Sequence, residues 1–309
     1  MLGYIVKRIL NALVVLWVVI TITFLLMHAI PGGPFTTEKN LPPAVMRNIE
    51  ERYKLNDPLP KQYADYLLNI THGDLGPSFK YQGRTVNDII KESFPVSFHL
   101  GMDSIILAIF IGIPAGVFAA LKRNRWQDRV INFCTTLGVA VPSFVMAALF
   151  IEVFALKLGI LPSAMWNGWK SQILPAVALA GMPMAFITRL TRSSMLDVLG
   201  QDYIKTAKAK GLSAFTVLWK HALPNSLIPV VTYIGPMAAG ILTGSFVIES
   251  IFAIPGLGRY FVTSIYNRDY TVILGVTIFY SALIIVMNML VDLVYPLLDP
   301  RIKLGKKGN

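Results

Sequence analysis

Four carboxylates lie within long apolar stretches of the sequence, at Asp103, Glu152, Glu249 and Asp292. An ionisable side chain in such a setting is costly unless it faces protein or water, so it can line a solute path, serve a proton relay or join helices. A relay needs several acids along one route, whereas these four are spread over four stretches. Asn288 lies four residues before Asp292 on one helical face, where the pair favours helix joining over solute binding. Glu249 is therefore the first candidate for a pore or gate residue, followed by Glu152, Asp103 and Asn288.

The sequence lacks the motifs with which a protein would drive or catalyse a reaction by itself. It contains no G-x-x-x-x-G-K-[ST] phosphate loop, so we do not expect it to bind ATP. H-E-x-x-H and G-x-S-x-G are also missing, which removes the usual metal site and nucleophile. The single cysteine, Cys134, falls in an apolar stretch and forms neither a disulfide framework nor a Cys-based metal site. We expect a non-catalytic chain that binds no cofactor and no metal.

A basic segment at 202–224, DYIKTAKAKGLSAFTVLWKHALP, has the pattern of two short amphipathic helices. Asp202 can cap the first helix, where a carboxylate suits the positive N-terminal end. One side of this helix is apolar, with Tyr203, Ile204 and Ala207. Lys205 and Lys208 fall on another side.

A bend is predicted between these two helices. Gly211 can end the first helix because glycine accepts the left-handed backbone conformation found after helix C-termini. Ser213 can cap the second helix, and Pro224, which follows Leu223, is expected to stop it. A basic loop can simply meet anionic lipid. Two short helices joined by a bend, however, have the shape of a docking element for another protein.

The elements that must position these residues are membrane-spanning helices. Of the 309 residues, 54% are hydrophobic and only 15% are charged, whereas about a quarter are charged in a soluble domain. Six stretches are long enough to cross a bilayer, at about 9–30, 99–121, 130–156, 173–190, 226–252 and 271–295. The net charge of +11 could suggest a nucleic-acid partner. Because the basic residues stand in short clusters between these stretches, membrane topology explains the charge better.

We therefore predict an all-α polytopic membrane protein with six transmembrane helices. Residues 1–30 form the first helix, 31–97 an external loop region, and 98–309 a five-helix core with a cytoplasmic docking loop at about 195–225. The external region contains helical patterns at Pro43 to Tyr53 and Leu59 to Ile70, and the turn GDLGPSF at 73–79. Lys and Arg are concentrated in the proposed inner segments, so both termini are expected in the cytoplasm.

Glycine pairs in two of the stretches favour close helix packing. They are Gly112-x-x-x-Gly116 in the second stretch and Gly240-x-x-x-Gly244 in the fifth. Prolines also lie within or near the stretches, among them Pro142, and each frees backbone groups and can bend its helix. Such bends suit a bundle that opens and closes, but they also occur in static bundles.

The basic segment resembles the cytoplasmic coupling loop of binding-protein-dependent ABC importer permeases. The residues at matching positions are Ala207, Gly211, Leu223 and Pro224, while Lys205 stands where the family has glutamate and Thr206 where it has its first alanine. The resemblance covers nearly the whole chain, through PGGPF at 31–35, Leu55-Asn56-Asp57-Pro58, Gln62-Tyr63, GDLGPSF, Pro142-Ser143-Phe144, Thr191 to Met195, Glu249 to Gly258, Asn267 to Tyr270 and Asp299-Pro300-Arg301. The chain is most similar to the B-type permease subunit of oligopeptide ABC importers, a relative of the dipeptide, nickel and glutathione permeases.

This resemblance implies a type I ABC importer permease fold in the bacterial cytoplasmic membrane. It implies pairing with a C-type permease, two ATPase subunits that bind ATP and Mg²⁺, and an extracytoplasmic peptide-binding protein. In the implied alternating-access mechanism, closure of the ATPases moves the docking helices. Tyr203, Ile204 and Ala207 would then be the packed face, Lys205 and Lys208 its charged rim, and Gly211 the bend.

Two other classes of protein compete with an ATPase-driven permease. An ion-coupled carrier should show an inverted repeat and clustered intramembrane charges, and neither is evident. A structural subunit of a non-transport complex should lack a structured docking loop. Within the importer family, dipeptides, nickel or glutathione remain alternative substrates. The scarcity of histidine within the spans favours peptides over nickel.

Overall fold

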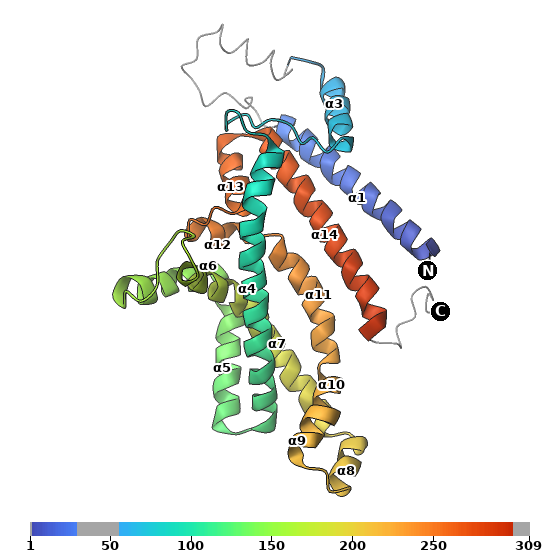
Figure 1. The fold of residues 1–309 in the computed structure, drawn as a ribbon, viewed down its shortest axis with the longest axis vertical. Helices are drawn as coiled ribbons and strands as arrows, with labels where there is room; N and C mark the ends of the chain where they lie inside the picture. Colours follow the sequence, from blue (N-terminus) through green and yellow to red (C-terminus); the bar gives the residue numbers. More distant parts are fainter. Residues whose placement is uncertain (1, 30–55, 299–309) are drawn as a thin grey trace. The chain divides into compact units, whose positions relative to one another are not determined.

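The structure is a computed structural model that describes residues 2–29 and 56–298. Regular structure in this part is helical, apart from an isolated antiparallel bridge between Pro77 and Thr85. The helices before the segment 202–224 are α1 (Leu2–Ala29), α3 (Leu59–Thr71), α4 (Val86–Leu121), α5 (Trp126–Ala140), α6 (Ser143–Phe150), the π-helix η1 (Ile151–Lys157) and α7 (Lys170–Leu199). Those that follow are α8 (Asp202–Ala209), α9 (Ala214–Thr216), the π-helix η2 (Val217–Ala222), α10 (Leu223–Ser226), α11 (Ile228–Leu242), α12 (Phe246–Ile251), α13 (Leu257–Asn267) and α14 (Tyr270–Leu298). Figure 1 shows their course.

These elements confirm the all-helical prediction. The predicted helix at 59–70 is α3, whereas the pattern at 43–53 and the tripeptide at 299–301 lie outside the described residues. Four helices are long and apolar enough to cross a membrane, within α1, α4, α7 and α14, and the count reaches six if each of two bent helix pairs forms one span. Helix α4 begins thirteen residues before the predicted span, because its polar first turn, which includes Asp88, continues without a break into the apolar stretch.

The predicted third span is not one continuous helix. Helix α5 ends at Ala140, Val141 has extended backbone (φ −91°, ψ 121°), and the segment from Ser143 to Lys157 leaves at an angle of 108°. The break falls at Val141 because Pro142 disfavours helical backbone in the residue before it.

The predicted fifth span is interrupted as well. Helix α11 ends at Leu242, and Gly244 has a φ of +92°, which places it in the left-handed region before α12 begins. A second bend of 47° separates the segment ending at Ser226 from α11. Gly244 can adopt this left-handed conformation because it has no β-carbon, and the conformation ends α11.

The chain divides into two compact units, the first made of Met1–Val96 and Gly256–Leu283 and the second of Ser97–Pro255 and Ile284–Asn309. In the first unit, Thr21 on α1 forms a hydrogen bond of 2.6 Å with the hydroxyl of Tyr63 on α3. Gly275 on α14 lies so close to Val86 that a β-carbon would come within 2.5 Å of a valine methyl. Tight contacts of this kind hold the first unit together.

The second unit has two apolar cores. One joins α4, α7 and α11 through buried side chains at Ile105, Ala108, Ala180, Ile187, Val230, Met237, Ile241 and Leu242. The other joins the ends of α4 and α7 to the segment 202–224, through Ala120, Met195, Ile204, Ala207, Val217 and Ala222. The second core therefore fixes the predicted coupling loop to two long helices.

The two glycine pairs behave differently. A β-carbon on Gly116 would come within 2.5 Å of the Thr188 carbonyl oxygen and 2.6 Å of the Thr191 β-carbon. One on Gly112 would come within 3.0 Å of Ile187. A β-carbon on Gly240, in contrast, would meet nothing within 4 Å among the described residues. Close packing is confirmed for the pair on α4, which lies against α7, but Gly240 makes no close helix approach.

Candidate functional site

The predicted coupling loop folds as two short helical pieces separated by a bend, at the end of the second unit (Figure 1). Gly211 has a φ of +76°, and its N–H donates to the Lys208 carbonyl over 3.0 Å. Ser213 caps α9, since its hydroxyl accepts from the Thr216 N–H over 3.2 Å. The bend at Gly211 and the cap at Ser213 are confirmed.

Two local predictions for this loop were wrong. Asp202 is not the N-cap: Gln201 holds that position, and Asp202 stands in the first turn, where its carboxylate lies 2.8 Å from the exposed Lys205 ammonium. Pro224 does not stop the helix, because it lies in the first turn of α10, where proline is tolerated. The π-helix η2 precedes Pro224, and its hydrogen-bond pattern differs from that of an α-helix. This change of pattern falls close to Pro224, which has no N–H to donate.

The side predicted to be the packed face is turned largely toward the chain's own core. Ile204 is fully buried and Ala207 is 6% exposed, both in the second apolar core beside Met195. Tyr203 is 44% exposed, and its hydroxyl accepts a hydrogen bond of 3.2 Å from the Asn225 side chain. Ile204 and Ala207 therefore anchor the loop, and Tyr203 belongs to the outer side.

A second apolar surface, which was not predicted from the sequence, is exposed on this loop. It consists of Leu212, Phe215 and Trp219, and we call it the aromatic surface. Phe215 is 70% exposed and Trp219 is 56% exposed, with ring centroids 5.9 Å apart. Their i, i+4 spacing was the available signal, because residues four apart share a helical face. Lys205 and Lys208 are exposed on the same loop.

A buried ion pair holds the helix that leads into this loop. Arg192 on α7 donates from Nε and Nη2 to the two carboxylate oxygens of Asp128 on α5, over 2.6 and 2.8 Å. Asp128 is 3% exposed, and its remaining acceptor positions receive the Asn124 N–H at 2.9 Å and the Asn132 amide at 2.7 Å. The sequence carries no direct signal for this pairing, since the two residues are 64 positions apart.

A second arginine adds to the same helix contact. Arg189, one turn before Arg192, donates to the hydroxyls of Thr135 and Thr136 over 3.1 and 2.8 Å. Two successive turns of α7 are thus bonded to α5.

The predicted pore or gate residues lie on four different helices. Glu249 is fully buried in the first turn of α12. Glu152 lies on η1, 3.3 Å from the Lys157 ammonium, with both side chains at least half exposed. Asp103 on α4 lies 3.7 Å from His99, and Asn288 on α14 is exposed. No group of three or more potential metal-ligating side chains occurs among the described residues, and a role for these four in a pore stays a prediction.

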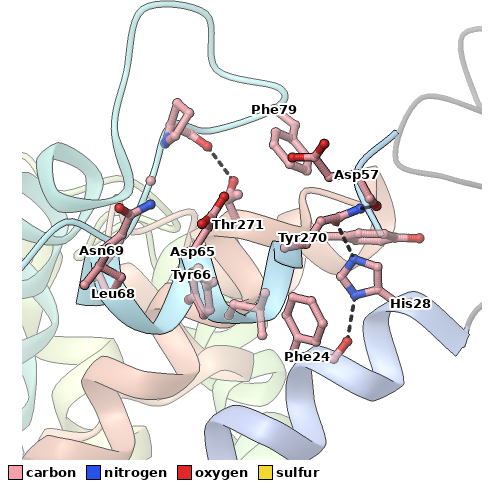
Figure 2. Close-up of a pocket in the computed structure, with 15 residues that line it drawn as sticks. Phe24, His28, Asp57, Asp65, Tyr66, Leu68, Asn69, Phe79, Tyr270 and Thr271 are labelled. Carbon is pink, nitrogen blue, oxygen red and sulfur yellow. Dashed lines mark hydrogen bonds between the residues drawn. The ribbon is translucent and has the colours of Figure 1, made fainter. Parts of the chain in front are cut away.

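The first unit contains a cavity of about 450 Å³ between α1, α3, the 75–79 turn and the start of α14. Figure 2 shows the rings of Phe24, Tyr66 and Tyr270 around it, and Asp57 and Asp65 also line it. His28 contacts the Phe24 carbonyl oxygen at 2.8 Å. Burial raises the pKa of the Tyr66 phenol well above its ordinary value, and its hydroxyl has no hydrogen-bond partner among the described residues.

The GDLGPSF turn at 73–79 meets the start of α14 through one carboxylate. Asp269 is fully buried and accepts from the Ser78 hydroxyl, from the N–H groups of Phe79 and Lys80 at 3.2 Å each, and from the Thr271 hydroxyl at 3.0 Å. It also caps α14 by accepting the Val272 N–H at 3.3 Å. Two sequence motifs 190 residues apart therefore form one structure.

Comparison with known proteins identifies the family. Residues 112–304 match the model described as "binding-protein-dependent transport system inner membrane component", and residues 1–101 match that of the N-terminal region of such membrane components. The chain is 52% identical over 308 residues to the dipeptide transport system permease protein DppB of Bacillus subtilis (strain 168), covering 100% of both chains. It is 49% identical over 306 residues to the oligopeptide transport system permease protein OppB of Salmonella typhimurium, covering 98% of this chain and 100% of that one.

Solved structures share the fold. The inward-facing MetNI methionine ABC transporter is similar with a TM-score of 0.58 and 18% identity, over 68% of this chain and 96% of that one. An amino acid ABC transporter gives a TM-score of 0.50 and 16% identity, over 70% and 95%. The helices thus adopt the type I ABC importer permease fold. With both family models and full-length relatives in agreement, the chain belongs to the inner-membrane permease components of binding-protein-dependent transport systems.

Proposed function

We propose that this chain forms one half of the membrane pore of an ATP-driven peptide importer, and that segment 202–224 is where partner ATPases act on it. One observation carries the proposal: Ile204 and Ala207 fix this segment to the chain's own core, while Phe215 and Trp219 are exposed on the aromatic surface. An apolar patch on a well-anchored element is a typical protein interaction site. Force applied there by a bound partner would reach α4 and α7 directly.

Membership of this family implies the remaining subunits of the proposed importer. They are a second permease, two ABC ATPases that bind ATP and Mg²⁺, and an extracytoplasmic binding protein that delivers the solute. Segment 202–224 and both chain termini would then face the cytoplasm. Relatives named as dipeptide and as oligopeptide permeases both match this chain along its full length, and we propose peptides as the substrate class.

The direct test is uptake by the reconstituted importer. The chain is co-expressed with the second permease and ATPases of the same organism, purified, and placed in proteoliposomes with the binding protein outside. We expect ATP-dependent uptake of labelled peptide, with the ratio of dipeptide to pentapeptide uptake defining the length preference. An assembly whose ATPases lack the phosphate-loop lysine is the control. Solute uptake by this chain alone under an ion gradient would contradict the proposal.

A further inference from the structure

Helix α7 is a shared support for the coupling loop and for α5. It runs without interruption from Lys170 to Leu199. Near its end, Met195 packs against Ile204 and Ala207 of the loop. One turn earlier, Arg192 binds Asp128 on α5. A displacement of the loop would therefore reach the Arg192 position through less than one turn of helix.

The contact between α7 and α5 is directional as well as strong. Arginine presents two parallel N–H groups that match the two oxygens of a carboxylate, which fixes the relative orientation of the partners. The Asn124 N–H and the Asn132 amide complete the coordination of Asp128. Side-chain exposure is 4% for Asp128 and 24% for Arg192, so water cannot readily take the place of Arg192 at the Asp128 carboxylate. Removing one partner would leave a buried charge unpaired.

The position of this pair on α7 indicates which neighbouring helices would move with α7. Gly116 packs α4 against the same turn of α7, where Thr188 and Thr191 leave no room for a β-carbon. Helix α5 then runs to the break at Val141, beyond which the chain turns by 108°. The stretch from Trp126 to Ala140 is thus bonded to α7 near its start, where Asp128 binds Arg192, and again where Thr135 and Thr136 bind Arg189, and it ends at a break in the helix.

We propose that the Asp128–Arg192 pair is the joint through which displacement of the coupling loop reaches α5. We assign it a positioning role, because its bonds join two helices of this chain. The inference rests on the proposed function, because it presupposes ATPases that move the loop. With the joint intact, α5 follows α7 during the ATP cycle. Without it, only the weaker bonds from Arg189 to Thr135 and Thr136 remain, so the ATPases continue to hydrolyse ATP while α5 follows α7 less closely and transport falls.

Cys134, the chain's single cysteine, is exposed on α5 and can report its movement. The complete importer is assembled with partner subunits free of cysteine. The rate of maleimide labelling at Cys134 is measured with and without ATP, beside ATP hydrolysis and peptide uptake on the same preparation. If the ion pair has a purely structural role, its loss impairs assembly, Cys134 labelling, ATP hydrolysis and peptide uptake together. If it is a joint, its loss reduces the labelling response and peptide uptake but leaves ATP hydrolysis in place.

Three variants make the test specific. Asp128→Asn removes the charge at nearly constant volume, and Arg192→Lys keeps the positive charge but cannot form two parallel bonds. Arg129→Gln is the matched control, because it removes a neighbouring exposed charge that has no bonded partner among the described residues. In Asp128→Asn we expect uptake per ATP to fall about tenfold, with the ATP-dependent change at Cys134 reduced. For Arg192→Lys we expect an uptake per ATP between that of Asp128→Asn and that of the wild type. This second variant tests the inference if Asp128→Asn fails to assemble.

The outcomes separate the joint from the proposed function. A wild-type importer without ATP-driven peptide uptake contradicts the proposed function itself. If the wild type transports but Cys134 labelling does not respond to ATP, α5 does not move and the joint is rejected. Wild-type uptake per ATP in both assembled pair variants, or an equal loss in Arg129→Gln, also overturns the inference.

Discussion

At the scale of single residues, the left-handed backbone at Gly211 sets the bend of the coupling loop, and Gly211→Pro should uncouple ATP hydrolysis from uptake. A proline cannot adopt a φ of +76° and has no N–H for the Lys208 carbonyl, so the path of the chain between α8 and α9 must change. We expect a stably assembled importer whose uptake per ATP falls. Gly159→Pro is the matched control, because Gly159 also has a positive φ (+64°) and a β-carbon there would meet nothing within 4 Å. Normal uptake by the assembled Gly211→Pro variant would rule out this role for the bend.

Asp269→Asn should destabilise the first unit. The carboxylate accepts hydrogen bonds from five groups, and an amide of the same size would turn an NH₂ toward some of these donors. The expected cost is about 1–3 kcal/mol, seen as a lower midpoint of thermal unfolding in detergent and faster proteolysis of the 73–85 region. Asp65→Asn, which changes a carboxylate that lines the cavity, serves as control. Equal stability of the two variants would show that the Asp269 network contributes little.

Local backbone requirements are readable from single residues, whereas distant partners are not. The sequence predicts the roles of Gly211 and Ser213 correctly, because the need for a left-handed residue and for a cap is local. It does not indicate that Asp128 and Asp269 are central, since their donors come from segments 64 and about 190 residues away. The residue type alone gives no information about such distant partners.

At the scale of helices, the apolar stretches show which segments are helical but not where the helices bend. Apolar length identifies α1, α4, α7 and α14 as spans. Pro142 indicates a possible bend, yet a proline does not encode an angle of 108°. The π-helices η1 and η2 are also beyond prediction, because they depend on packing rather than on a sequence pattern.

The two glycine pairs allow a matched test of helix packing. Gly116→Ala should lower stability by about 1–3 kcal/mol, because its β-carbon would overlap the backbone of α7. Gly240→Ala should be neutral or slightly stabilising, since its β-carbon meets no neighbour and alanine favours helix by about 1 kcal/mol. Thermal unfolding of the purified chain in one detergent compares them. A destabilisation of Gly240→Ala as large as that of Gly116→Ala would contradict the difference in packing between the two positions.

At the scale of the whole molecule, the sequence predicts the family and the fold. It predicts only part of the surface of segment 202–224 that we propose contacts a partner. The motif positions point to Ala207 and its neighbour Ile204, which are buried. The aromatic surface lies between the matching positions Gly211 and Leu223, with Phe215 and Trp219 on the second helical piece. Ile204 and the motif residue Ala207 therefore anchor the loop, and we expect the exposed residues of the aromatic surface to contact the partner.

The central claim is that partner ATPases act on the chain through the aromatic surface, and peptide-stimulated ATP hydrolysis by the assembled importer tests it most directly. The comparison is between the wild type, Phe215→Ala/Trp219→Ala, and Phe110→Ala/Trp126→Ala, a control pair that is 75% and 70% exposed elsewhere in the chain. We predict that the first double variant folds normally but retains about one tenth or less of the stimulated hydrolysis and of the co-purifying ATPase. The control pair should retain both. Wild-type hydrolysis and ATPase retention in Phe215→Ala/Trp219→Ala would contradict the claim.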